Sequence, residues 1–124
     1  TDVCVPLSRL PDCIAAIKTE IAATGFVAPL IGHVGDGNFH LGILFDAALP
    51  GERERAEALA HRTGERAIRL GGTCSGEHGI GLHKLDLMAL EHGGALDLMW
   101  AVKRAFDPHG IMNPGKLLPP RDSD

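Results

Sequence analysis

Apolar positions recur with the period of a strand in some parts of the chain and with the period of a helix in others. Residues 2–6 alternate and include β-branched side chains, which predicts a strand. Residues 26–34 and 39–45 predict two more strands, and the turn-forming run at residues 35–38 predicts that they form a hairpin. A fourth, short strand is expected at the start of residues 73–81.

Between these predicted strands, the apolar residues recur at helical spacing, which predicts helices. The first long helix is expected to begin at Ser8, as its N-cap, and to end at Gly25. Residues 52–70 carry charge on one side and an apolar stripe on the other, which predicts a second long helix. Two shorter helices and an extended, proline-rich tail are expected at residues 84–91, 95–106 and 111–120.

The order strand, helix, strand, strand, helix, strand predicts an α+β fold with a ferredoxin-like antiparallel sheet. Both long helices then lie on one face of the sheet, and the C-terminal helices and the tail follow. We expect one domain over residues 1–124. Its core is expected to include Leu96, Met99, Trp100, Val102 and Phe106.

Composition excludes several classes of protein. The net charge is -4 and the basic residues form no stripe, which argues against a nucleic-acid partner. No apolar run has the length of a membrane span. The three cysteines are far apart and form no CxxC pair, so we expect a reducing setting without disulfides. The chain opens in a strand pattern without a methionine, which predicts a piece of a longer protein.

Two histidines flank the predicted hairpin turn. If residues 35–38 form the loop, Val34 pairs with Phe39 and His33 pairs with His40. Directly opposed side chains share a face, with Cβ atoms about 4.5–5.5 Å apart, so the two imidazoles could share one metal ion. The alternative is a hairpin with two incidental histidines. The loop lacks the carboxylate spacing and the closing glutamate of an EF-hand.

A second polar pair, Glu77 and His78, lies among glycines at residues 76–81. Glu77 could be a third ligand, completing a His2Glu set with open positions, and His78 could be a general base. The alternative is a surface turn with solvated side chains. No GxGxxG run supports a Rossmann site. The other histidines are expected to play no direct part in chemistry: His61, His83, His92 and His109.

Three segments together resemble one family: GHVGDGNFH at residues 32–40, GGTCSGEHGIG at residues 71–81 and FDPHGIMNPGKLL at residues 106–118. Their order and spacing resemble the C-terminal domain of FAD-linked oxidases of the vanillyl-alcohol oxidase type. Within that family the opening residues and the hairpin are most similar to the D-lactate dehydrogenase (cytochrome) branch. Glycolate oxidase catalytic subunits and D-2-hydroxyglutarate dehydrogenases share the framework.

The resemblance implies specific roles for six residues. His33, His40 and Glu77 match the ligands of a divalent ion, zinc or manganese, and His78 matches the base at the substrate. The tail is expected to return to the flavin domain, which places Asn113 and Lys116 near the FAD.

The resemblance also implies the chemistry of the full-length protein. We expect a D-2-hydroxyacid, D-lactate first, to be oxidised with hydride transfer to FAD, and electrons to pass to a cytochrome or quinone. The FAD-binding domain is expected outside this chain, which alone would be inactive. Gly42 stands where hydroxyglutarate dehydrogenases have a substrate-contacting asparagine, which favours a smaller substrate. A cytoplasmic protein, peripheral at the membrane and able to form a homodimer, is expected.

Two other functions fit the same residues. One is a stand-alone metal-binding or ligand-sensing module of ferredoxin-like fold, since that fold carries many unrelated functions. The other is a metal-dependent hydrolase that uses His33, His40 and Glu77. An FAD-binding domain encoded upstream would favour the dehydrogenase, and its absence would favour the module.

Overall fold

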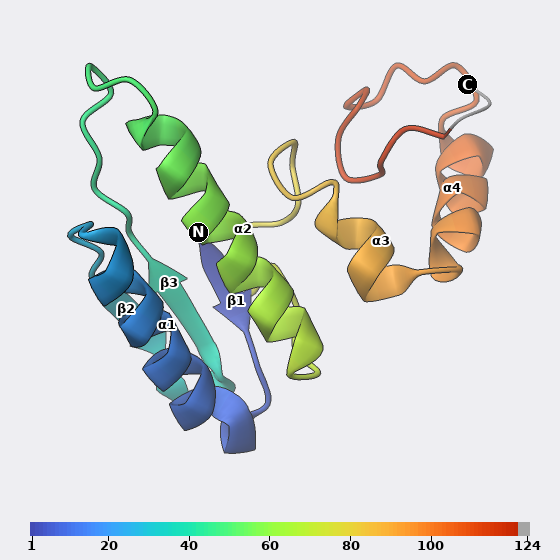
Figure 1. Cartoon of the computed structure of the whole chain (residues 1–124). Coiled ribbons are helices and arrows are strands. Elements are labelled where there is room, and N and C mark those ends of the chain that lie inside the picture. The colour runs from blue at the N-terminus through green and yellow to red at the C-terminus, as the bar shows by residue number, and fades with distance from the viewer. Residues whose placement is uncertain (122–124) are drawn as a thin grey trace. The chain divides into compact units, whose positions relative to one another are not determined.

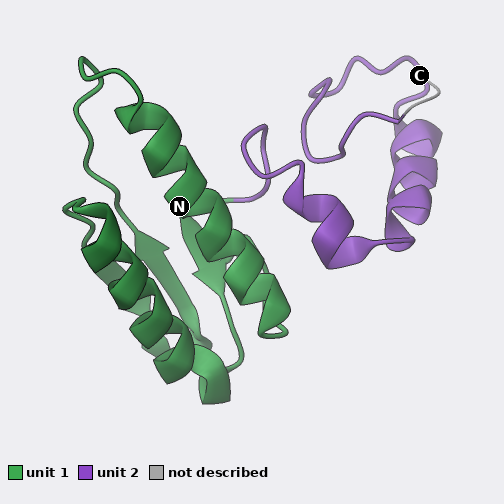
Figure 2. Cartoon of the chain, viewed as in Figure 1, with its two compact units in different colours: residues 1–78 green, residues 79–124 purple. Residues whose placement is uncertain are grey.

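The computed structural model describes residues 1–121. The chain forms two compact units, Thr1–His78 and Gly79–Asp124 (Figure 2). Among the described residues, no helix combines the length and apolar character needed to cross a membrane.

The first unit is built on a three-stranded antiparallel sheet (Figure 1). Its strands are β1 (Asp2–Cys4), β2 (Leu30–His33) and β3 (Asn38–Leu41), in the order β1-β3-β2. The expected fourth strand is reduced to a single antiparallel bridge between Thr73 and Cys4. That bridge lies on the free edge of β1, where the ferredoxin-like order places a fourth strand. The predicted α+β class is confirmed.

Two long helices, α1 (Leu10–Thr24) and α2 (Glu52–Arg69), cover the same face of this sheet (Figure 1). Their apolar stripes meet the inward side chains of the strands, and each large apolar side chain buried in this way stabilises the fold by about 1.5–3 kcal/mol. The buried cluster consists of Val3, Val5, Leu10, Cys13, Ile17, Phe39, Leu41, Leu59 and Ala67.

The start of α1 differs from the prediction. Ser8 is not the N-cap, because it lies inside a 3-10 turn, η1 (Leu7–Arg9). The carbonyl of Pro6 accepts a hydrogen bond from the backbone N–H of Arg9 at 2.7 Å, which closes that turn before the α-helix begins. The end of the helix is as predicted: Gly25 takes a left-handed conformation with φ 76°.

The hairpin turn is held by a close approach between distant parts of the chain. Its residues form a 3-10 turn, η2 (Val34–Asp36), followed by Gly37 at φ 74°. A Cβ atom on Gly37 would lie 2.0 Å from the carbonyl oxygen of Val5, so no other residue fits there without moving the backbone. The N–H of Val5 donates to the carbonyl of Gly37 at 3.0 Å. The turn is therefore fixed against the segment that follows β1.

This turn corrects the predicted register. Because the loop occupies residues 34–37, His33 pairs with Asn38 and Ile31 pairs with His40. The predicted pairing of His33 with His40 is wrong by two residues, and Val34 is exposed instead of buried. A slip of two residues keeps every side chain on its face, so the two histidines still share one face.

The second unit contains α3 (Leu87–His92), α4 (Ala95–Phe106) and the tail. The Asp107 carboxylate accepts hydrogen bonds from the backbone N–H groups of residues 111 and 112 and pairs with Lys103. The Lys103 ammonium, opposed in part by burial, holds the pKa of the Asp107 carboxyl below its ordinary value. The indole N–H of Trp100 donates to the carbonyl of Pro119 at 3.2 Å.

The prediction that α4 contributes to the core is wrong. No residue of α4 is buried, and Phe106 keeps 81% of its surface exposed. A unit of this size has too little chain to surround a helix, since small structures bury a smaller fraction of their surface.

An ion-pair network ties α1 to α2 on the rim of the first unit. The Glu20 carboxylate accepts hydrogen bonds from the guanidinium groups of Arg62 and Arg66. Burial raises the pKa of the Glu20 carboxyl, but the hydrogen bonds from the two arginines outweigh that effect and the net pKa is lowered. A carboxyl of lowered pKa stabilises the fold above its ordinary pKa, and the contribution is lost as the pH falls toward the folded value.

We predict that Glu20→Gln lowers the free energy of unfolding at neutral pH by about 1–3 kcal/mol, because hydrogen bonds to a charged group are lost. The difference in the free energy of unfolding between the variant and wild type should become smaller as the pH is lowered below 4.5, the ordinary pKa of a glutamate carboxyl. Urea unfolding of the chain at several pH values measures both effects. The control is Glu57→Gln, whose exposed pairing with Arg53 at 4.0 Å should contribute no more than about 0.5 kcal/mol. Equal losses for the two variants would contradict the prediction.

Candidate metal centre

The face of the sheet opposite the helices carries polar side chains. Along β3, Phe39 and Leu41 enter the core, so alternation directs Asn38 and His40 to the other face. The register places Asp2 of β1 directly beside His40.

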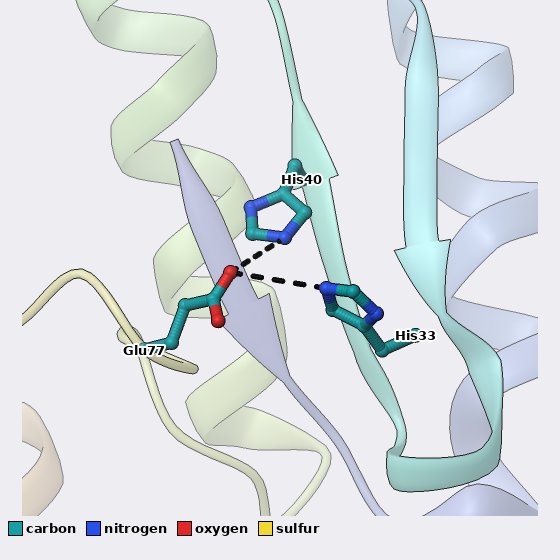
Figure 3. A group of neighbouring side chains, drawn as sticks. All are labelled: His33, His40 and Glu77. Carbon is teal, nitrogen blue, oxygen red and sulfur yellow. Dashed lines mark ion pairs between the residues drawn. The ribbon is translucent and has the colours of Figure 1, made fainter.

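Two histidines and a glutamate meet on this face. Figure 3 shows His33 at the end of β2 and His40 on β3, with Glu77 reaching them from the loop that follows the Thr73 bridge. The Oε1 atom of Glu77 lies 2.9 Å from Nε2 of His40 and 4.0 Å from Nε2 of His33 (Figure 3). The two imidazole rings are edge to face, with centroids 5.6 Å apart. The structure thus brings together the three residues that were predicted as ligands from the sequence.

The donor set fits a divalent ion. One ligand atom from each of His33, His40 and Glu77 lies within 4.8 Å of the other two. Imidazole nitrogen and carboxylate oxygen are donors that suit zinc and manganese, with zinc–ligand bonds of about 2.0–2.2 Å. Three protein ligands leave coordination positions open, which is the usual form of a catalytic centre. That these residues bind a metal stays a prediction.

His78 lies beside this group. Its ring stacks on His40 with centroids 5.0 Å apart and planes at 28°. Its Nε2 atom is 3.7 Å from Oε1 of Glu77, and its Nδ1 atom is 3.6 Å from Oδ1 of Asp2. The side chain is more than half exposed, so a small molecule can reach it. The role of His78 as a base stays a prediction.

Asn113 and Lys116 belong to the second unit. They form a tight turn in which the N–H of Lys116 donates to the carbonyl of Asn113 at 3.3 Å, and Asn113 has a φ of 46°. Both residues are exposed. Their place beside a flavin stays a prediction.

Two residues of the centre were missed by the sequence analysis. Asp2 is buried, and its Oδ2 atom accepts hydrogen bonds from the backbone N–H groups of Glu77 at 2.7 Å and His78 at 3.1 Å. Asn38 is buried below Gly76, and its Oδ1 atom has no hydrogen-bond partner among the described residues. The pairing of β1 with β3 makes an acidic residue a neighbour of His40, and no local pattern in the sequence indicates that pairing.

Comparison with known proteins gives one family. The family described as FAD linked oxidases, C-terminal domain, matches residues 1–117. A protein of Arabidopsis thaliana named D-lactate dehydrogenase (cytochrome), mitochondrial, is 46% identical over 121 residues. A probable D-lactate dehydrogenase, mitochondrial, of Danio rerio is 45% identical over 119 residues, and the glycolate oxidase subunit GlcD of Escherichia coli strain K12 is 40% identical over 119 residues.

These relatives are much longer than the chain. The alignments cover 97%, 95% and 95% of this chain, in the order given above, but 21%, 24% and 24% of the relatives. The chain therefore spans about a quarter or less of the length of the curated relatives it matches.

We predict that Gly76→Ala displaces the loop that carries Glu77. An added Cβ atom would lie 2.1 Å from Oδ1 and 2.6 Å from Cγ of Asn38, and Asn38 is a buried residue. Loss of stability by about 1–3 kcal/mol is expected from such overpacking, together with shifted histidine resonances in NMR spectra.

The matched control for this substitution is Gly35→Ala, because a Cβ atom at Gly35 meets nothing within 4 Å. In a protein that also carries Asn38→Ala, the loss of stability caused by Gly76→Ala should be smaller, because the amide that the new Cβ atom would meet is absent. Equal losses of stability with and without Asn38→Ala would show that the position of the loop does not depend on the contact between Gly76 and Asn38.

Proposed function

Because this chain belongs to the FAD linked oxidases as their C-terminal domain, we propose that the full-length protein is a flavin-dependent dehydrogenase of D-2-hydroxyacids, with D-lactate as its substrate. The observation that carries the proposal is the meeting of His33, His40 and Glu77 on the open face of the sheet, with His78 beside them. A 2-hydroxyacid offers a hydroxyl and a carboxylate oxygen, which together suit an ion with open coordination positions.

The choice of a small substrate rests on the relatives and on Gly42. Relatives named D-lactate dehydrogenase or glycolate oxidase subunit support a short acid over a long one. Gly42 follows β3, two residues beyond His40, so alternation gives it the same face as the ligands. It presents no side chain there, whereas the hydroxyglutarate branch would offer an asparagine to a second carboxylate. D-lactate has no second carboxylate that needs such a partner.

Each residue of the candidate site has a separate role in the proposed reaction. His33, His40 and Glu77 would hold the ion, and a bound divalent ion supplies Lewis acidity toward the substrate hydroxyl. His78 would accept the hydroxyl proton at Nε2, the ring nitrogen nearer to Glu77. FAD supplies the acceptor for the α-hydrogen of the substrate. Gly79, directly after His78, leaves space for a substrate to approach, because even a Cβ atom there would meet nothing within 4 Å.

Other parts of the reaction lie outside this chain. We infer that an FAD-binding domain of the same protein completes the site, with Asn113 and Lys116 of the tail facing its cofactor. The name of the Arabidopsis thaliana relative includes a cytochrome, which supports a cytochrome as the next electron acceptor, with a quinone as the alternative. Self-association into a homodimer is a further expectation.

We predict that His78→Asn and Glu77→Gln fail in different ways in the full-length protein. His78→Asn should keep metal and flavin and lose about 10²–10⁴-fold in kcat, because a general base is removed. Glu77→Gln should weaken metal binding, and added metal should restore part of its activity. Steady-state kinetics with D-lactate and metal analysis of the purified proteins measure both.

The control is His61→Asn, since His61 lies on α2, which packs on the other face of the sheet. Near-normal turnover of a metal-loaded His78→Asn variant would place the base elsewhere. A wild-type protein that oxidises no D-2-hydroxyacid, with metal and flavin present, would refute the proposed function.

A further inference from the structure

The first residue of β1 is a buried acid. Asp2 keeps only 1% of its surface exposed, although burial of a carboxylate is costly unless the group is paired or hydrogen-bonded. It faces away from the apolar core, because its neighbour Val3 fills that side of the strand. Contacts of both its oxygen atoms connect this acid to the candidate metal centre.

One oxygen atom holds the loop of the candidate metal centre. Oδ2 accepts hydrogen bonds from the successive backbone N–H groups of Glu77 and His78, at 2.7 and 3.1 Å. Hydrogen bonds to an ionised carboxylate are about twice as strong as neutral ones. Because Asp2 is the register partner of His40, these bonds fix the backbone of Glu77 opposite that histidine.

The other oxygen atom faces the ring of His78. Oδ1 lies 3.6 Å from Nδ1 of His78, and the opposite ring nitrogen, Nε2, lies 3.7 Å from Oε1 of Glu77. In the proposed site the Glu77 carboxylate would be engaged by the ion, so Asp2 is the acceptor that remains for the ring, and a proton held on Nδ1 leaves the lone pair of Nε2 available to the substrate. In this orientation the ring of His78 also stacks on that of His40.

We propose that Asp2 is a positioning residue with two separable tasks. Its Oδ2 atom sets the place of the ligand Glu77, and its Oδ1 atom sets the orientation and tautomer of His78. This inference rests on the proposed function, in which Glu77 is a ligand and His78 is the base. It adds a residue to which neither the sequence pattern nor the family resemblance assigned a role.

Asp2→Asn separates the two tasks in the full-length protein. With its amide oxygen in the place of Oδ2, asparagine keeps an acceptor for both backbone N–H groups. Its amide nitrogen then presents a donor to Nδ1 of His78 and favours the wrong tautomer. Zinc affinity, measured by competition with a chelator, should stay within about 3-fold of wild type, while kcat at saturating zinc should fall about 10–100-fold.

Asp2→Ala removes both tasks. Zinc affinity should fall about 10–100-fold, as is typical when an outer-shell partner is lost, and kcat at saturating zinc should fall as well. Asp12→Asn is the control, because Asp12 is an exposed acid in the first turn of α1. It should leave both quantities unchanged. A purely structural role for Asp2 would change the yield of folded protein but would not separate zinc affinity from kcat.

The outcomes distinguish this inference from the proposed function. Zinc-dependent turnover in wild type, with Asp2→Asn unchanged in kcat, overturns the inference alone, and it does so even if Asp2→Ala fails to fold. A folded Asp2→Ala variant with wild-type zinc affinity overturns it as well. A wild-type protein that binds no zinc and needs none overturns the proposed function and this inference with it.

Discussion

Strand β3 (Asn38–Leu41) lies between β1 and β2, and the alternation of its four residues organises the first unit. Phe39 and Leu41 face the two helices and form the middle of the core. Asn38 and His40 face the other way. The two helices cover one face of the sheet, and the candidate ligands His33, His40 and Glu77 meet on the other. Any change that slipped β3 by one residue would exchange core and site at once.

The sequence predicted the elements and the shared face of the histidines because both depend on local periodicity. It could not predict the register, since the start of the turn depends on the contact of Gly37 with Val5, far away in the chain. Asp2 was missed for the same reason, because its role follows from the pairing of β1 with β3. The exposure of α4 was missed because apolar spacing does not reveal how much chain is present to cover a helix. Local patterns therefore predict which residues belong to the candidate site, and long-range strand pairing determines how those residues are arranged.

The three candidate ligands are held in place in different ways. His33 and His40 stand on paired strands, so the backbone ladder determines their separation. Glu77 stands on a loop, which a sheet cannot position by itself. A buried carboxylate at Asp2 and a glycine seated on Asn38 supply that position. Groups around metal ligands commonly orient them, and Asp2 would do so for the proposed ligand Glu77.

The central claim is that His33, His40 and Glu77 hold one divalent ion in the full-length protein. Crystals of that protein grown with zinc, measured at energies on both sides of the zinc absorption edge, test it directly. We expect one anomalous peak within about 2.0–2.2 Å of an imidazole nitrogen of each histidine and an oxygen of Glu77. A fully zinc-loaded, active protein whose only anomalous peak lies away from these three side chains would contradict it.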